Sequence, residues 1–202
     1  MSYITREIIN QSYTYNQFRK ELDELLKEGK TTGENHSEDL VKYTKMNLHR
    51  MKRLEKKPEL NEELKKALDQ IENPQIWFVL VEGWCGDVAQ NLPTINKMAE
   101  YTDKIELRLV LRDEHLDIMD QYLTNGTRSI PKLVSLDKEA LDELWTWGPR
   151  PVECQNKVEE MKQQEMDKKE MAENIHHWYA KDNTESLQKE FARLVQVGEL
   201  QE

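Results

Sequence analysis

A pentapeptide at a strand-to-helix junction constrains this chain more than any other feature. Trp84-Cys85-Gly86-Asp87-Val88 follows the apolar run 76–81 and leads into a helical turn at 89–92. Such a run, rich in β-branched and aromatic residues, predicts a buried strand. Cys85 would then stand at the start of a helix, where free amides and the helix dipole favour a thiolate. Asp87 opposes that charge, so we expect a pKa below the usual 8.5 or so, but lowered less than the helix alone would give.

Strand-like and helix-like stretches alternate through the middle of the chain. The expected strands are 76–81, 105–111, 132–136 and 143–147, and the expected helices are 86–101 and 115–123, the latter closed by Asn125-Gly126. The order βαβαββ predicts a parallel pair of strands joined by a right-handed crossover, followed by an antiparallel pair.

Polar helical segments flank this region. The expected helices before it are 15–28, ending at Gly29-Lys30, then one capped by Ser37 and interrupted by Pro58, and 61–71; those after it are 152–180 and 186–197, separated at 181–184. We therefore divide the chain into an N-terminal extension (1–72), a core domain (73–155) and a C-terminal extension (156–202). The amphipathic stripes of the extensions fit either covering the core or building a homodimer.

Two prolines and one glycine follow the pentapeptide at characteristic separations in the sequence. Pro93 lies eight residues after Cys85, Pro131 of the pair Ile130-Pro131 lies 46 residues after it, and Gly148 lies 17 residues beyond Pro131. With Trp84-Cys85-Gly86 in this order of elements, they resemble the active-site frame of the thioredoxin superfamily over about 73–155. Together with residues 147–151, Trp-Gly-Pro-Arg-Pro, the motif is similar more narrowly to a bacterial group of thioredoxin family proteins with long helical flanks.

The resemblance implies a thioredoxin-like α/β fold, βαβαββα with a mixed four-stranded sheet, and a role for each site residue. Cys85 would be the catalytic thiol, facing a cis Ile130-Pro131 bond. The loop before Pro131 would pair with an extended substrate segment, a form of strand addition. The substrate-binding residues would be Trp84, Gly86, Asp87, Ser129, Ile130, Pro131 and Arg150. For Arg150 three readings stay open: lowering the thiol pKa, binding a substrate carboxylate, or being a surface arginine on a rigid loop.

Two departures from the family pattern remove half of its chemistry. Val88 replaces the second cysteine, and Val79 stands where the resemblance places a buried acid. What remains is exchange by one thiol, in which Cys85 attacks a disulfide and awaits a second thiol from a protein or a small molecule. Cys154 is either a resolving thiol from outside the pentapeptide or a packed, idle one.

Two rival functions fit the same residues. One is a non-catalytic binding module that keeps the scaffold for its groove, since the long charged flanks exceed what the core requires. The other borrows from monothiol glutaredoxins, in which one cysteine and glutathione hold an iron–sulfur cluster, but no glutathione-binding set is recognisable. His176 and His177 would point about 100° apart on a helix and make a poor metal pair. We therefore expect no metal and no cofactor.

Composition narrows the setting. A net charge of −10 over 202 residues disfavours nucleic acid and anionic membranes as partners. No apolar stretch approaches the roughly 18 residues of a membrane-spanning helix, and the first residues lack the apolar core of a secretory signal. Two cysteines make no disulfide framework, so we expect a cytoplasmic protein.

Overall fold

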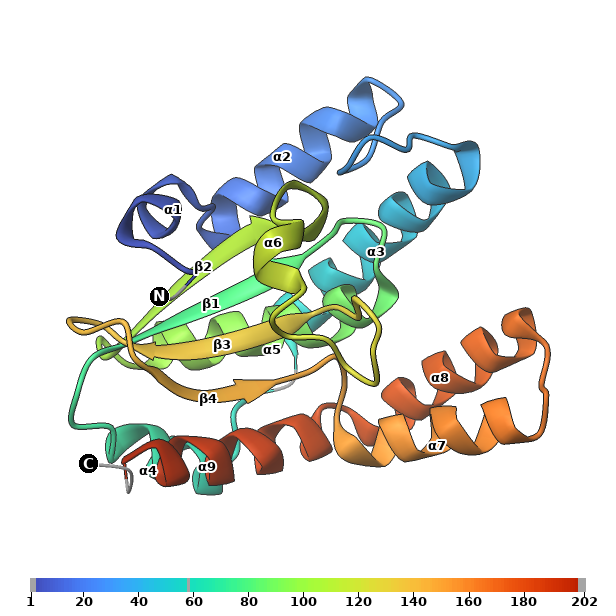
Figure 1. Ribbon diagram of the computed structural model, residues 1–202. Helices are drawn as coiled ribbons and strands as arrows, with labels where there is room; N and C mark the ends of the chain where they lie inside the picture. The colour runs from blue at the N-terminus through green and yellow to red at the C-terminus, as the bar shows by residue number, and fades with distance from the viewer. Residues whose placement is uncertain (1–2, 58, 200–202) are drawn as a thin grey trace.

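A mixed four-stranded sheet forms the centre of the computed structural model, which describes residues 3–57 and 59–199 (Figure 1). The strands are β1 (Gln75–Val81), β2 (Ile105–Leu111), β3 (Lys132–Asp137) and β4 (Glu143–Trp147). Their order in the sheet is β2-β1-β3-β4, with β1 parallel to β2 and antiparallel to β3, and β3 antiparallel to β4. The predicted α/β class, the parallel pair and the closing hairpin are confirmed.

Helices surround this sheet (Figure 1). They are α1 (Arg6–Gln11), α2 (Tyr15–Lys27), α3 (Glu38–Lys56), α4 (Glu62–Asp69), α5 (Gly86–Tyr101), α6 (Leu116–Met119), α7 (Val152–Gln163), α8 (Lys168–Asp182) and α9 (Glu185–Glu199), with a 3₁₀ turn η1 (Arg112–Glu114). The helices expected at 15–28, 61–71, 86–101 and 186–197 are confirmed to within a few residues, as is α3 after Ser37. Helix α1 was not expected. Pro58, the predicted interruption, lies outside the described residues.

The single helix expected over 152–180 is wrong. The chain folds back between α7 and α8, where Glu165 has a positive φ of 53°. The Asp167 side chain then accepts hydrogen bonds from the amides of Lys169 and Glu170 and starts a new helix. An Asp-x-x-Glu pattern at 167–170 was the available signal. The break after α8 is confirmed, because Asn183 adopts the left-handed conformation.

The helix expected over 115–123 is much shorter than predicted. Only α6 forms there, and the following residues make a loop that carries two positive φ values, 50° at Asn125 and 72° at Gly126. Arg128 pairs with both carboxylate oxygens of Asp120 across this loop, at 2.6 and 2.9 Å, so the side chains favour the turn over further helix.

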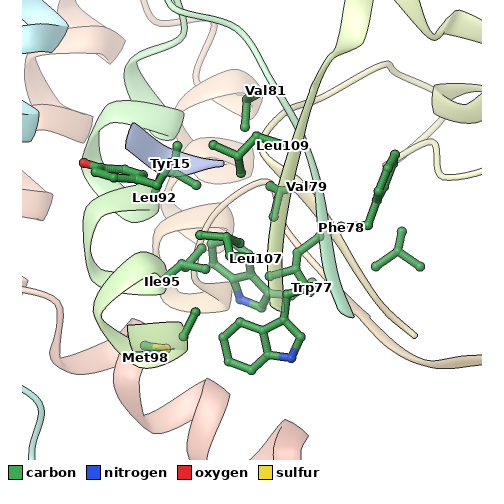
Figure 2. Packing of buried hydrophobic residues seen from close by; sticks show 14 of the residues in the cluster. Tyr15, Trp77, Phe78, Val79, Val81, Leu92, Ile95, Met98, Leu107 and Leu109 are labelled. Atoms are coloured by element: carbon green, nitrogen blue, oxygen red, sulfur yellow. The ribbon is translucent and has the colours of Figure 1, made fainter. Parts of the chain in front are cut away.

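Helix α5 packs along one face of the sheet and carries the candidate site at its first turn. Figure 2 shows Leu92 and Ile95 of α5 beside the side chains of Val79, Leu107 and Leu109, all buried. Helix α3 packs against α5 in turn. Burial on both sides explains why α5 is the most apolar of the longer helices.

Helix α9 packs against the β4 side of the sheet through an aromatic cluster. The Phe191 ring lies 5.3 Å from Trp77, 5.7 Å from Trp145 and 5.2 Å from Trp147, each in an edge-to-face arrangement. Trp145 and Trp147 are both buried in this cluster. Of the helices in the described ranges, none has the length and apolar character needed to cross a membrane.

Candidate functional site

Cys85 occupies the junction between β1 and α5, as the sequence predicts. It is the N-cap residue of α5, with extended φ and ψ of −78° and 121°, and it is partly buried. Its thiol donates a hydrogen bond to the carbonyl of Ile130, with Sγ and O 3.3 Å apart. The Ile130-Pro131 bond is cis, as the family resemblance implies. The thiol and the proline loop therefore face one another.

Gly148 closes the other side of the proline loop. It follows β4 directly with a φ of +115°, a conformation that side chains rarely adopt. A Cβ at this position would overlap the carbonyl oxygen of Pro131. Only glycine lets the end of β4 approach the loop so closely, which accounts for the spacing of this marker from Pro131.

Asp87, in the first turn of α5, is held by residues from the C-terminal part of the chain. Its carboxylate forms an ion pair with Arg150 and accepts a hydrogen bond of 2.8 Å from the hydroxyl of Tyr179. Asn91 donates to the same Tyr179 oxygen at 2.9 Å, and Arg150 also donates to Gln155 at 2.8 Å. The surface reading of Arg150 is wrong, because its side chain is only 16% exposed and neutralises Asp87.

The pKa of the Cys85 thiol is raised to about 12, so the expectation of a lowered value is wrong. Burial is the larger cause, and the negative charge of Asp87 is the next. The backbone amides of Val88 and Asp87 and the charge of Arg150 act in the predicted direction and lower the pKa, but by less. The sequence shows the helix start, whereas the degree of burial depends on packing that it does not show.

Helices α3 and α8 of the two extensions contact the residues on either side of Cys85, and sequence reasoning missed these contacts. Asn47 of α3 donates to the carbonyl of Gly83 at 2.9 Å. Arg50 of α3 and His176 of α8 both lie over Gly86: a Cβ on that glycine would be 3.6 Å from Arg50 Nη1 and 3.5 Å from His176 Cε1. In the sequence Arg50 belongs to a charged helix face, which gives no sign of proximity to Cys85.

A buried acid supports the loop before Cys85. Glu82 is fully buried, accepts a hydrogen bond from the Thr32 hydroxyl, and accepts another from the Asp113 amide at 2.9 Å. Burial raises the pKa of Glu82. Trp84 follows, with the guanidinium carbon of Arg112 4.9 Å from its ring centroid. An acidic residue directly after the apolar run 76–81 was a signal for such a position.

The remaining residues singled out in the sequence are Ser129, Val79, Val88 and Cys154. Ser129 exchanges a hydrogen bond of 2.7 Å with the Thr127 hydroxyl, so its side chain belongs to the loop. Val79 and Val88 are both buried. Cys154, in the first turn of α7, is fully buried as a free thiol, and burial and the Asp87 charge raise its pKa to about 12. The burial agrees with the packed alternative for Cys154, and nothing in the structure tests a resolving role. Within 3–57 and 59–199, no three His, Cys, Asp or Glu side chains are grouped to hold a metal ion.

The sequence and the fold of this chain are similar to those of known proteins. A family model described as thioredoxin matches residues 33–162, well over half of the chain. A protein of unknown function from Pseudomonas aeruginosa, solved as a crystal structure, is 19% identical with a TM-score of 0.65, over 97% of this chain and 98% of that one. An HIV epitope scaffold is 18% identical with a TM-score of 0.63, over the same shares. At these identities the two structures show a common fold only. No curated protein matches the chain.

Proposed function

Because this chain belongs to the thioredoxin family, and has the thioredoxin-like fold that its motifs implied, we propose that it performs thiol–disulfide exchange with Cys85 as a single nucleophilic sulfur. The observation that carries the proposal is the position of that sulfur, at the start of α5 and 3.3 Å from the Ile130 carbonyl of the cis-proline loop. A partner segment that pairs with this loop would bring its own disulfide to Cys85.

The exchange needs no change in the total number of electrons. The Cys85 thiolate bonds to one sulfur of the partner disulfide, the old S–S bond breaks, and the other sulfur leaves with the electron pair and takes up a proton. Since position 88 is valine, the mixed disulfide stays until a second thiol attacks the partner sulfur and releases Cys85. We assign that step to a low-molecular-weight thiol from solution.

The resting thiol is poorly ionised, which sets the expected speed. With a pKa of about 12, the thiolate fraction at pH 7 is about 10⁻⁵, compared with a few per cent for a free cysteine. A thiolate of higher pKa is intrinsically more nucleophilic, with a Brønsted slope of about 0.4–0.5, so exchange would be roughly a hundredfold slower than for free cysteine. Partner binding that adds hydrogen-bond donors near the sulfur would restore part of this loss.

A comparison of three proteins tests the proposal. The wild type, Val88→Cys and Cys85→Ser are incubated with a protein disulfide and a small thiol, and mixed disulfides are detected by mass spectrometry. We expect a mixed disulfide at Cys85 in the wild type, faster reduction in Val88→Cys, and neither in Cys85→Ser. A wild type that never forms the mixed disulfide, beside an active Val88→Cys, would refute single-thiol exchange while leaving the scaffold competent.

The raised thiol pKa favours a second candidate, a partner-binding module that does no chemistry. In that case Cys85→Ser would capture partners as well as the wild type does, and reducing agents would not release them. For both candidates we propose a cytoplasmic setting, supported by two cysteines that remain free thiols.

A further inference from the structure

Two basic side chains from separate helices meet beside the residue that follows Cys85. Arg50 projects from α3 and His176 from α8, and both come within van der Waals range of the side-chain position at Gly86. Gly86 is bonded directly to Cys85, so the pair lies beside the residue that carries the thiol.

The guanidinium of Arg50 has no carboxylate partner in the described part of the chain. Its hydrogen bonds go to the neutral side chains of Asn47, at 3.0 Å, and Met46, at 3.4 Å. The nearby carboxylate of Asp87 is already occupied by Arg150 and Tyr179. The Nδ1 atom of His176 is buried without a hydrogen-bond partner. A guanidinium without a carboxylate partner, beside an imidazole nitrogen without a hydrogen-bond partner, favours an anion from outside.

Resting on the proposed function, we propose that Arg50 and His176 form a carboxylate-binding subsite for an acidic residue beside the disulfide cysteine of a peptide substrate. A guanidinium can bind a carboxylate through two parallel hydrogen bonds, a bidentate geometry. The same face of α3 continues with Tyr43 and Met46, whose residues are 49% and 37% exposed. An exposed aromatic and thioether surface next to the subsite suits a peptide segment better than a small thiol.

The test uses two peptides that differ only in Glu or Gln next to their cysteine, each activated as a thiopyridyl disulfide. Attack by Cys85 forms the protein–peptide disulfide and releases thiopyridone, whose absorbance gives the rate. We expect the wild type to prefer the Glu peptide about tenfold, and Arg50→Gln to lose most of that preference. Lys52→Gln removes the same charge from an exposed position of α3 and should keep the preference.

The outcomes separate the subsite from the exchange reaction. Equal rates for both peptides in the wild type would overturn the subsite and leave exchange intact. If neither peptide reacts, exchange fails, and S-methylated peptides then decide the subsite by NMR: the Glu form alone should raise the pKa of His176, and no change would overturn the inference. Glutathione activated in the same way, as its thiopyridyl disulfide, reacting faster than the Glu peptide would overturn the assignment to a longer peptide.

Discussion

The charge of Asp87 should hold the reactivity of Cys85 down, and Asp87→Asn should release it. Asparagine keeps the shape, and its single carbonyl oxygen can still accept from Arg150 while its NH2 group faces the Tyr179 oxygen, but it no longer opposes a second negative charge. The freed charge of Arg150 then acts on the sulfur without compensation. A neighbouring charge typically moves a pKa by 1–3 units, and the amides and burial remain, so we expect the Cys85 pKa to fall by about 1–2 units from about 12.

That shift raises the thiolate fraction at pH 7 about tenfold to a hundredfold. Intrinsic nucleophilicity falls as the pKa falls, so the exchange rate should increase only about threefold to tenfold. Thiolate absorbance measured against pH gives the pKa, and thiopyridone release from a neutral disulfide gives the rate. Cys85→Ser supplies the background from Cys154. Arg150→Gln should move the pKa upward instead. An unchanged or raised Cys85 pKa in Asp87→Asn would refute the electrostatic argument.

Three predictions concern stability. Gly148→Ala should lower the free energy of unfolding by on the order of 3 kcal/mol or more, because the new Cβ would overlap the Pro131 carbonyl and φ is +115°. Gly126→Ala, which also has a positive φ but open space around it, should lower it by only about 1 kcal/mol. Equal losses in denaturant titrations would contradict this reasoning. Phe191→Ala should cost about 3–5 kcal/mol by the same titrations followed by circular dichroism, and a loss under 1 kcal/mol would mean that α9 contributes little. Burial raises the folded-state pKa of Glu82, so its contribution to stability is present below the unfolded pKa of about 4.3 and is lost as pH rises through the folded pKa; Glu82→Gln should flatten that decline, and an identical pH dependence would rule out this source.

Most of the fold could be predicted from local sequence patterns, because the spacing of apolar residues indicates the strands and most of the helices of this chain. The run 75–81 is buried at every position, and α5 begins where the glycine after Cys85 suggested. The α7–α8 reversal was missed because it depends on one left-handed residue and one capping aspartate inside an otherwise continuous helical pattern. Periodicity alone does not detect such a turn.

The site residues that belong to sequence motifs were predictable, but their contacts with residues distant in the sequence were not. The positions of Cys85, Pro131 and Gly148 follow from motif and spacing, and the cis form of the Ile130-Pro131 bond follows from the family resemblance. The partners of Asp87 do not, because Tyr179 lies 92 residues away on a helix whose position is set by tertiary packing. The prediction of a lowered pKa for the Cys85 thiol was wrong for the same reason. Burial raises the pKa by more than the start of the helix lowers it, and the burial of Cys85 depends on the packing of the whole chain.

The aromatic cluster around Phe191 also gives the protein internal optical probes. Three of the five tryptophans, Trp77, Trp145 and Trp147, surround that ring, so undocking of α9 would expose them to water and shift their emission to longer wavelength. Trp84 lies elsewhere, next to Cys85 and beneath Arg112, where a thiolate or a bound sulfur would quench it. Emission wavelength would then report on the C-terminal helix and emission intensity on the thiol, in one sample without any added label.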